Sequence, residues 1–213
     1  ARTGVAMRVF HISGEQFSEL DGLPEALPAT GYLWVGSARR EFEVQAATLQ
    51  AALQRWTGGQ LVDLHISDLL NNQLPSHFDY TSDYDLLVFR RLARGKSETD
   101  LSKPGEILHH GSHQGGPSIL SRIDTSPVAF VVFDRVVVSV HPTDCAVRDT
   151  FAARMLSTSS LPVAQAVHRL PANPADLMLR MVGSVVDGYL DLRRELTRQL
   201  DHWQSELLNP KAR

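Results

Sequence analysis

The feature that most constrains how this chain can fold is one long amphipathic segment, residues 174–208. Asn173 is a good N-cap, Pro174 suits the first helical position because its missing N–H costs nothing there, and Asp176 adds a negative charge to the first turn. Apolar residues then recur at steps of three and four: Val185, Tyr189, Leu192, Leu196, Leu200, Trp203 and Leu207. A helix of this length spans about 50 Å. That is longer than a compact domain of this size is wide, so the far half of the helix needs a partner outside the core.

Composition places the rest of the chain among ordinary globular proteins. It has 213 residues, 43% of them hydrophobic, and a formal charge of -3, which fits one domain or one domain with an appendage. A single cysteine, Cys145, excludes an intrachain disulfide and suits a reducing cytosol. The near-balanced charge argues against nucleic-acid binding. No apolar run approaches the roughly 20 residues that cross a bilayer, and the start lacks a signal-peptide pattern, so we expect a soluble chain.

Short apolar runs rich in Val, Ile and aromatic residues predict β-strands at residues 7–12 and 31–37. The run at 84–93 is apolar on both faces, which predicts a strand in the interior of a sheet. Within 128–142, two valine-rich runs separated by Asp134 and Arg135 predict a hairpin with a two-residue turn. Residues 94–122 predict mainly loop, with a short strand near Ile107.

Helical spacing of apolar residues predicts three further helices, at residues 41–56, about 64–71 and 143–157, and glycines after Trp56 stop the first of them. The fold class we predict is α/β (α+β): an αβα sandwich with a mixed sheet of about six or seven strands and a long C-terminal helix. We expect residues 1–170 to form the αβα domain and residues 171–213 to form a helical arm.

Histidines 109, 110 and 113 are the most conspicuous candidate metal ligands, but the glycines around them argue against a rigid site, and we interpret them as a solvated loop. Asp187 and Asp191 are one helical turn apart and could hold a cation, but we interpret them as helix-surface charges beside Arg194 and Arg198. Arginines 90 and 91 are interpreted as a solvated face. No nucleotide-binding or hydrolase motif is present, and we expect no enzyme activity.

Residues 68–92, "DLLNNQLPSHFDYTSDYDLLVFRRL", resemble a segment of the CorA-type divalent metal ion transporters, including the ZntB branch. In the family, this segment begins with Glu-Asp, followed by Ile or Leu and then Leu-Asn. It continues with Gln-Arg-Pro-Lys and a tyrosine, and it ends with an apolar strand and a basic residue. The strand pair at 128–142 and the helix that begins at "PADLMLRMV" also resemble this family in order and spacing. The resemblance covers most of residues 30–208.

The sequence departs from the family pattern at three positions. Ser67 stands where the family has an acidic residue, and Leu74 and Ser76 replace basic residues around the proline. The family's stalk helix, its two membrane helices and the Gly-Met-Asn pore signature between them do not occur in these 213 residues. What the resemblance implies is therefore an N-terminal cytoplasmic domain, whose last helix would lead toward the stalk and membrane helices of a longer parent protein.

The resemblance implies a cytoplasmic regulatory, metal-sensing domain of a CorA-like or ZntB-like transporter of divalent cations (Mg²⁺, Co²⁺ or Zn²⁺). It places Asp68 where family members use an acidic residue for metal sensing between subunits, with Mg²⁺ or Zn²⁺ as the regulatory ion, bound weakly by this chain alone. The parent would be a homopentamer in the bacterial inner membrane, with this domain at its cytoplasmic face, and we expect residues 1–213 to be a monomer or weak dimer. Two alternatives are a soluble α/β module whose exposed helix docks another protein, and a zinc hydrolase that uses the three histidines.

Overall fold

The computed structural model describes residues 7–93, 124–143, 145–160 and 169–208. These residues fall into two compact units. The first includes the described residues up to Arg90 and Ser126–Ser184, and the second includes the remaining ones, among them most of the last helix. The candidate site discussed below lies wholly in the first unit. Among the helices of these ranges, none is both long and apolar enough to span a bilayer.

Seven strands form one mixed sheet in the order β2-β1-β3-β7-β6-β5-β4. Their bounds are β1 Arg8–Ser13, β2 Gln16–Leu20, β3 Tyr32–Ala38, β4 His77–Tyr80, β5 Asp85–Ala93, β6 Asp124–Val132 and β7 Val136–His141. The central pair, β3 and β7, is parallel, whereas β1–β2, β1–β3, β6–β7 and β4–β5 are antiparallel. Strands β3 and β7 are buried along their whole length, as expected for strands covered on both faces.

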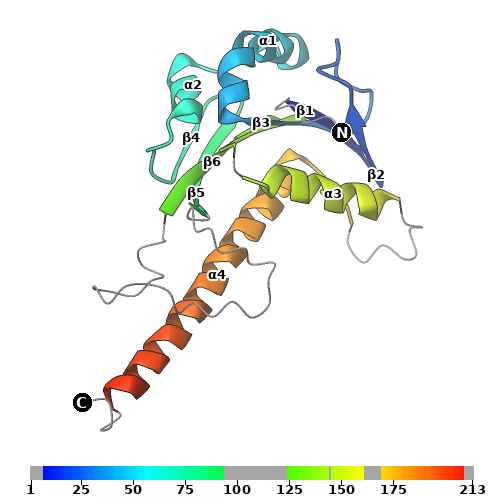
Figure 1. Cartoon of the computed structure of the whole chain (residues 1–213). Coiled ribbons are helices and arrows are strands. Elements are labelled where there is room, and N and C mark those ends of the chain that lie inside the picture. Colours follow the sequence, from blue (N-terminus) through cyan, green and yellow to red (C-terminus); the bar gives the residue numbers. More distant parts are fainter. Residues whose placement is uncertain (1–6, 94–123, 144, 161–168, 209–213) are drawn as a thin grey trace. The chain divides into compact units, whose positions relative to one another are not determined.

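In the described ranges, four helices accompany the sheet: α1 Arg39–Thr57, α2 Asp63–Leu70, α3 Val147–Ser159 and α4 Pro174–Leu207. Helices α1 and α2 lie over one face of the sheet, and α3 lies over the other (Figure 1). Two buried apolar clusters correspond to these two faces. One contains Phe42 and Leu53 of α1, and the other contains Phe151 of α3 and Leu177 of α4. The predicted α/β fold, with its mixed sheet and long C-terminal helix, is confirmed.

The local signals read from the sequence explain where several elements begin and end. Asn173 caps α4, because its side-chain oxygen accepts a hydrogen bond of 2.9 Å from the N–H of Asp176. Gly58 ends α1 in the left-handed conformation, with φ at 77° and its N–H bonded to the carbonyl of Gln54. The N–H of Phe133 donates to the carbonyl of Val136, which closes the hairpin around Asp134 and Arg135 as predicted.

Two strands were not predicted. Strand β2 pairs with β1 at one edge of the sheet, and β4 pairs with β5 at the other. Both are short and partly exposed, so neither carries a continuous apolar run. The short strand predicted near Ile107 lies outside the described residues. β4 matters most here, because it carries two of the side chains of the candidate site.

Candidate metal site

The residue that the sequence analysis singled out, Asp68, lies near the C-terminal end of α2 with its side chain 17% exposed. Buried Leu69, together with Leu70 and Ile66, packs α2 against the sheet, and this packing turns Asp68 toward the edge strand β4. There the Oδ2 atom of Asp68 is 3.6 Å from Nε2 of His77, whose side chain is 30% exposed. The sequence analysis did not single out His77.

A second His–Asp pair lies beside the first. The buried His65, three residues before Asp68 on α2, has its Nε2 atom 3.0 Å from Oδ2 of Asp79 and its Nδ1 atom 2.8 Å from the hydroxyl of Tyr84. The Tyr84 oxygen also accepts a hydrogen bond from the N–H of Val62. The hydrogen bond from His65, together with one from the N–H of Tyr80, holds the pKa of Asp79 below its ordinary value. His65 therefore fastens α2 to β4 and to Tyr84, the residue that precedes β5.

The loop between α2 and β4 is held by Arg90 of β5. The guanidinium of Arg90 donates to the carbonyl of Leu74 at 2.8 Å, and its backbone N–H donates to Oγ of Ser76 at 2.9 Å. Ser76 directly precedes His77 and is one of the positions where this sequence departs from the family pattern. The hydrogen bond from Arg90 to its hydroxyl holds the chain in place just before His77. The interpretation of Arg90 and Arg91 as a solvated face is wrong, because Arg90 binds this loop and Arg91 is only 8% exposed.

Among the other predicted candidates, the aspartates of α4 form no metal site in the described residues. His109, His110 and His113 lie outside the described residues. Asp191 forms an ion pair of 3.1 Å with Arg194, and both side chains are 76% exposed, which agrees with the interpretation as helix-surface charges. Within the described ranges, no group of three or more His, Cys, Asp or Glu is arranged to hold a metal ion. Helix α2 and strand β4 therefore bring together two His–Asp pairs, His65–Asp79 and His77–Asp68, and not a complete metal coordination sphere.

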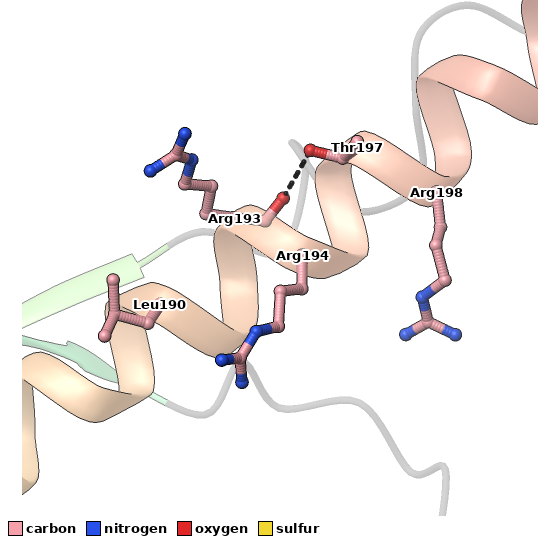
Figure 2. A pocket seen from close by; sticks show the side chains of 5 residues that line it. All are labelled: Leu190, Arg193, Arg194, Thr197 and Arg198. Carbon is pink, nitrogen blue, oxygen red and sulfur yellow. Dashed lines mark hydrogen bonds between the residues drawn. The ribbon is translucent and has the colours of Figure 1, made fainter.

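A shallow pocket lies along the second half of α4. It is lined by Leu190, Arg193, Arg194, Thr197 and Arg198, and Figure 2 shows these side chains spread along the helix. Two of the three arginines are paired within the helix, Arg194 with Asp191 and Arg198 with Glu195. Since the carboxylates neutralise most of this charge, the pocket is not a strongly basic surface.

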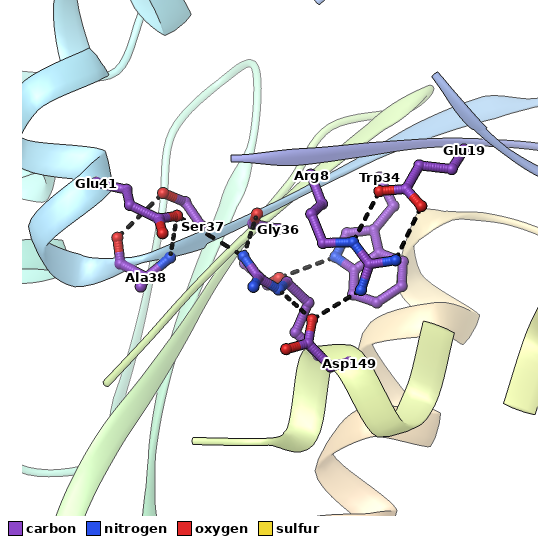
Figure 3. Close-up of polar contacts among 10 residues, drawn as sticks. Arg8, Glu19, Trp34, Gly36, Ser37, Ala38, Glu41 and Asp149 are labelled. Atoms are coloured by element: carbon purple, nitrogen blue, oxygen red, sulfur yellow. Dashed lines mark hydrogen bonds and ion pairs between the residues drawn. The ribbon is translucent and has the colours of Figure 1, made fainter. Parts of the chain in front are cut away.

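A network of charged side chains in the first unit was missed entirely by the sequence analysis. Arg148 of α3, with its side chain 11% exposed, donates to the carbonyl of Gly36 at 3.2 Å and lies 3.7 Å from the carboxylate of Glu41. It also contacts Asp149, which in turn binds Arg8 (Figure 3). These residues come from β1, β3, α1 and α3, so no local pattern could reveal them. Buried ion pairs of this kind are structural, and nothing in the arrangement points to chemistry.

Comparison with known proteins agrees with this fold. No protein-family model and no curated protein sequence matches the chain. Among solved structures, the full-length CmaX protein matches with a TM-score of 0.63 and 12% identity, over 95% of this chain and 52% of that one. The complete CorA magnesium transporter from Methanocaldococcus jannaschii matches with a TM-score of 0.59 and 10% identity, over 98% of this chain and 54% of that one.

A third match is to a soluble domain alone. The cytoplasmic domain of ZntB from Vibrio parahaemolyticus matches with a TM-score of 0.55 and 12% identity, over 91% of this chain and 64% of that one. This chain thus spans about half the length of the two full-length proteins. Its fold is that of the soluble domains of CorA- and ZntB-type proteins. The resemblance seen in the sequence is confirmed at the level of the fold.

Proposed function

We propose that this chain is the cytoplasmic regulatory domain of a CorA-like or ZntB-like transporter of divalent metal cations, and not an enzyme. The observation that carries the proposal is the fold match to two full-length proteins and to one isolated cytoplasmic domain, each over more than nine-tenths of this chain. The remainder of the protein would supply the stalk and membrane helices, and this domain would lie at the cytoplasmic face of the bacterial inner membrane.

Regulation would act through Asp68. Its carboxylate is partly exposed and lies on a helix that is fastened to the sheet, so it can meet a ligand without a rearrangement of the domain. A hard divalent cation prefers carboxylate oxygens, and it would be bound fully only when a neighbouring copy adds ligands. Such an ion stabilises one packing of the assembly, because a ligand shifts an equilibrium by its differential affinity for the two states.

Two experiments test this proposal. The gene should encode two apolar segments of about 20 residues after residue 213, and their absence would exclude a transporter of this type. In the complete protein, Asp68→Asn should weaken the response of the assembly to Mg²⁺ or Zn²⁺, measured as protection from proteolysis over a titration of each ion. Asp63→Asn, an exposed carboxylate in the first turn of the same helix, is the matched control.

One observation favours the alternative of a soluble partner-binding module. On the second half of α4, Leu200 is 59% exposed and Leu207 is 87% exposed. Large apolar side chains that recur along one helix often mark a docking surface. A gene that ends soon after residue 213, without apolar segments, would support this alternative.

A further inference from the structure

A second contact of His77 shows which of its two ring nitrogens carries the proton. The other ring nitrogen of His77, Nδ1, lies 3.2 Å from the carbonyl oxygen of Pro75. A carbonyl oxygen can only accept a hydrogen bond, so Nδ1 carries the proton in this contact. In the neutral ring, the Nε2 atom that faces Asp68 is then an acceptor with a lone pair.

The Asp68 carboxylate is also an acceptor when it is ionised. Two acceptors therefore face each other at 3.6 Å, with both side chains partly removed from water. This arrangement becomes favourable when a bridging water donates to both atoms, or when a proton on His77 or a metal ion lies between them. A metal ion fits the hydrogen bond from Nδ1 especially well, because metal-ligating histidines commonly donate their second ring N–H to a backbone carbonyl.

The separation of the two atoms is closer to the ligand spacing of Zn²⁺ than to that of Mg²⁺. Two ligands at about 2.0–2.1 Å from a tetrahedral Zn²⁺ lie about 3.3–3.4 Å apart, so a small movement of His77 completes the geometry. Neighbouring ligands of an octahedral Mg²⁺ lie closer, at about 3.0 Å, and Mg²⁺ prefers oxygen atoms to imidazole.

Among the described residues, the neighbouring charged groups do not complete the site. Each carboxylate oxygen of Asp79 already accepts a hydrogen bond, Oδ2 from His65 and Oδ1 from the N–H of Tyr80. The His65 ring is occupied by Asp79 and Tyr84. In the part of the chain that the structure describes, Asp68 and His77 are thus the two side chains left for a metal ion, and its other positions would be taken by water or by a neighbouring copy.

We propose that Asp68 Oδ2 and His77 Nε2 together bind one Zn²⁺-like cation, so that the regulatory site of this protein selects zinc over magnesium. The inference rests on the proposed role of Asp68 and adds to it a second ligand and the class of ion.

The test uses isothermal titration of the 213-residue chain with Zn²⁺ and separately with Mg²⁺, above neutral pH. Asp68→Asn and His77→Gln should each weaken Zn²⁺ binding about tenfold or more. His202→Gln, an exposed histidine on α4, is the matched control and should leave the affinity unchanged. Because histidines 109, 110 and 113 could also bind zinc, the same titrations are repeated with all three replaced by alanine, and the dependence on Asp68 and His77 should persist.

A nitrogen-15 spectrum of the imidazole rings provides a readout independent of affinity. Zn²⁺ should shift Nε2 of His77 while Nδ1 keeps its proton. A His77 ring that is protonated on both nitrogens and insensitive to Zn²⁺ would show that a proton fills the gap, and the inference would be wrong. It would also be wrong if His77→Gln bound Zn²⁺ normally, or if zinc binding disappeared with the alanine substitutions at 109, 110 and 113.

The two proposals fail in different ways. If Mg²⁺ binds more tightly than Zn²⁺, and binding depends on Asp68 but not on His77, the regulatory role of Asp68 stands and the zinc inference falls. If neither ion depends on Asp68, both fall.

Discussion

At the scale of single residues, the side chains that matter most are charged groups that the fold removes from water. Arg148 and Glu41 are the clearest pair, since their side chains are 11% and 4% exposed. Gly36 makes room for Arg148, because a Cβ atom at residue 36 would lie 2.7 Å from Cδ of Arg148. The small residue on β3 and the arginine on α3 are therefore coupled, although they are far apart in the sequence.

Arg148→Met should lower the free energy of unfolding by about 3–5 kcal/mol, because it leaves the Glu41 carboxylate buried without its partner. Urea unfolding followed by circular dichroism measures the change. Arg154→Met, at an exposed position of the same helix, is the matched control and should change stability by less than about 0.5 kcal/mol. Equal effects of the two substitutions would contradict a structural role for the buried pair.

Gly36→Ala should destabilise the protein because the new methyl group meets Arg148. The loss should be smaller when Arg148 is already alanine, since the clashing atoms are then absent. A double-mutant cycle from thermal unfolding measures this coupling. If the two effects are simply additive, Arg148 is not what limits the space at residue 36.

Arg8, Glu19 and Asp149 form the exposed part of the Arg148 network. We expect their contribution to the stability of the fold to decrease at acidic pH. The hydrogen bond from Arg8 holds the pKa of Glu19 below its ordinary value. Burial alone would raise the pKa of Asp149, but hydrogen bonds from Arg148 and Arg8 outweigh burial and hold it low as well. Because both pKa values are lower in the folded state, these groups stabilise the fold above the pKa of the unfolded carboxyls, about 4. That stabilisation is lost as the pH falls through the folded pKa values.

Arg8→Met should therefore reduce stability more at pH 7 than at acidic pH, because the stabilisation by the ionised carboxyls is lost as the pH falls through their lowered folded pKa values. Urea midpoints measured from pH 3 to pH 7 give the comparison, and Arg55→Met in the last turn of α1 is a control for the loss of one positive charge. An effect of Arg8→Met that does not change with pH would show that its packing over Phe10, and not its charge, stabilises the protein.

At the scale of elements, Phe130 and Phe78 show how differently two strands of one sheet contribute to the stability of the fold. Phe130 of β6 is fully buried, whereas Phe78 of the edge strand β4 is 60% exposed. Phe130→Ala should cost about 3–5 kcal/mol in unfolding free energy and unfold a marginal domain, while Phe78→Ala should cost far less. Thermal melting of both variants tests the assignment, and a normal melting curve for Phe130→Ala would place β6 outside the core.

At the scale of the whole molecule, we expect the apolar surface of α4 to determine how copies of the chain associate. Leu190, Leu200 and Leu207 are 45%, 59% and 87% exposed, and a repeated apolar surface of this kind favours association. A single helix face is a small interface, so we expect a monomer or weak dimer at micromolar concentration. Sedimentation measures this, and Leu200→Glu should remove any dimer, whereas Val44→Glu, at an isolated exposed valine of α1, should not. A stable pentamer of residues 1–213 would contradict this expectation.

Much of the fold was readable from the sequence because the signals are local. The run at 84–93 predicted β5, the Asn173 cap predicted the start of α4, and the glycines after Trp56 predicted the end of α1. Each rests on residues within a few positions of one another, where periodicity and capping operate. Strand β4, with four residues and alternating exposure, is too short to produce such a signal.

What the sequence by itself determined is therefore the set of long elements, the α/β class and the acidic position 68 on its helix. Only the tertiary structure decided what surrounds that position. His77 comes within 3.6 Å of Asp68 because β4 pairs with β5 and Arg90 fixes the loop before it, and Glu41 meets Arg148 across more than a hundred residues of chain. Hydrophobic periodicity specifies which face of an element is buried, but it carries no information about which polar side chains of two distant elements meet. Those contacts are fixed only when the whole sheet has assembled.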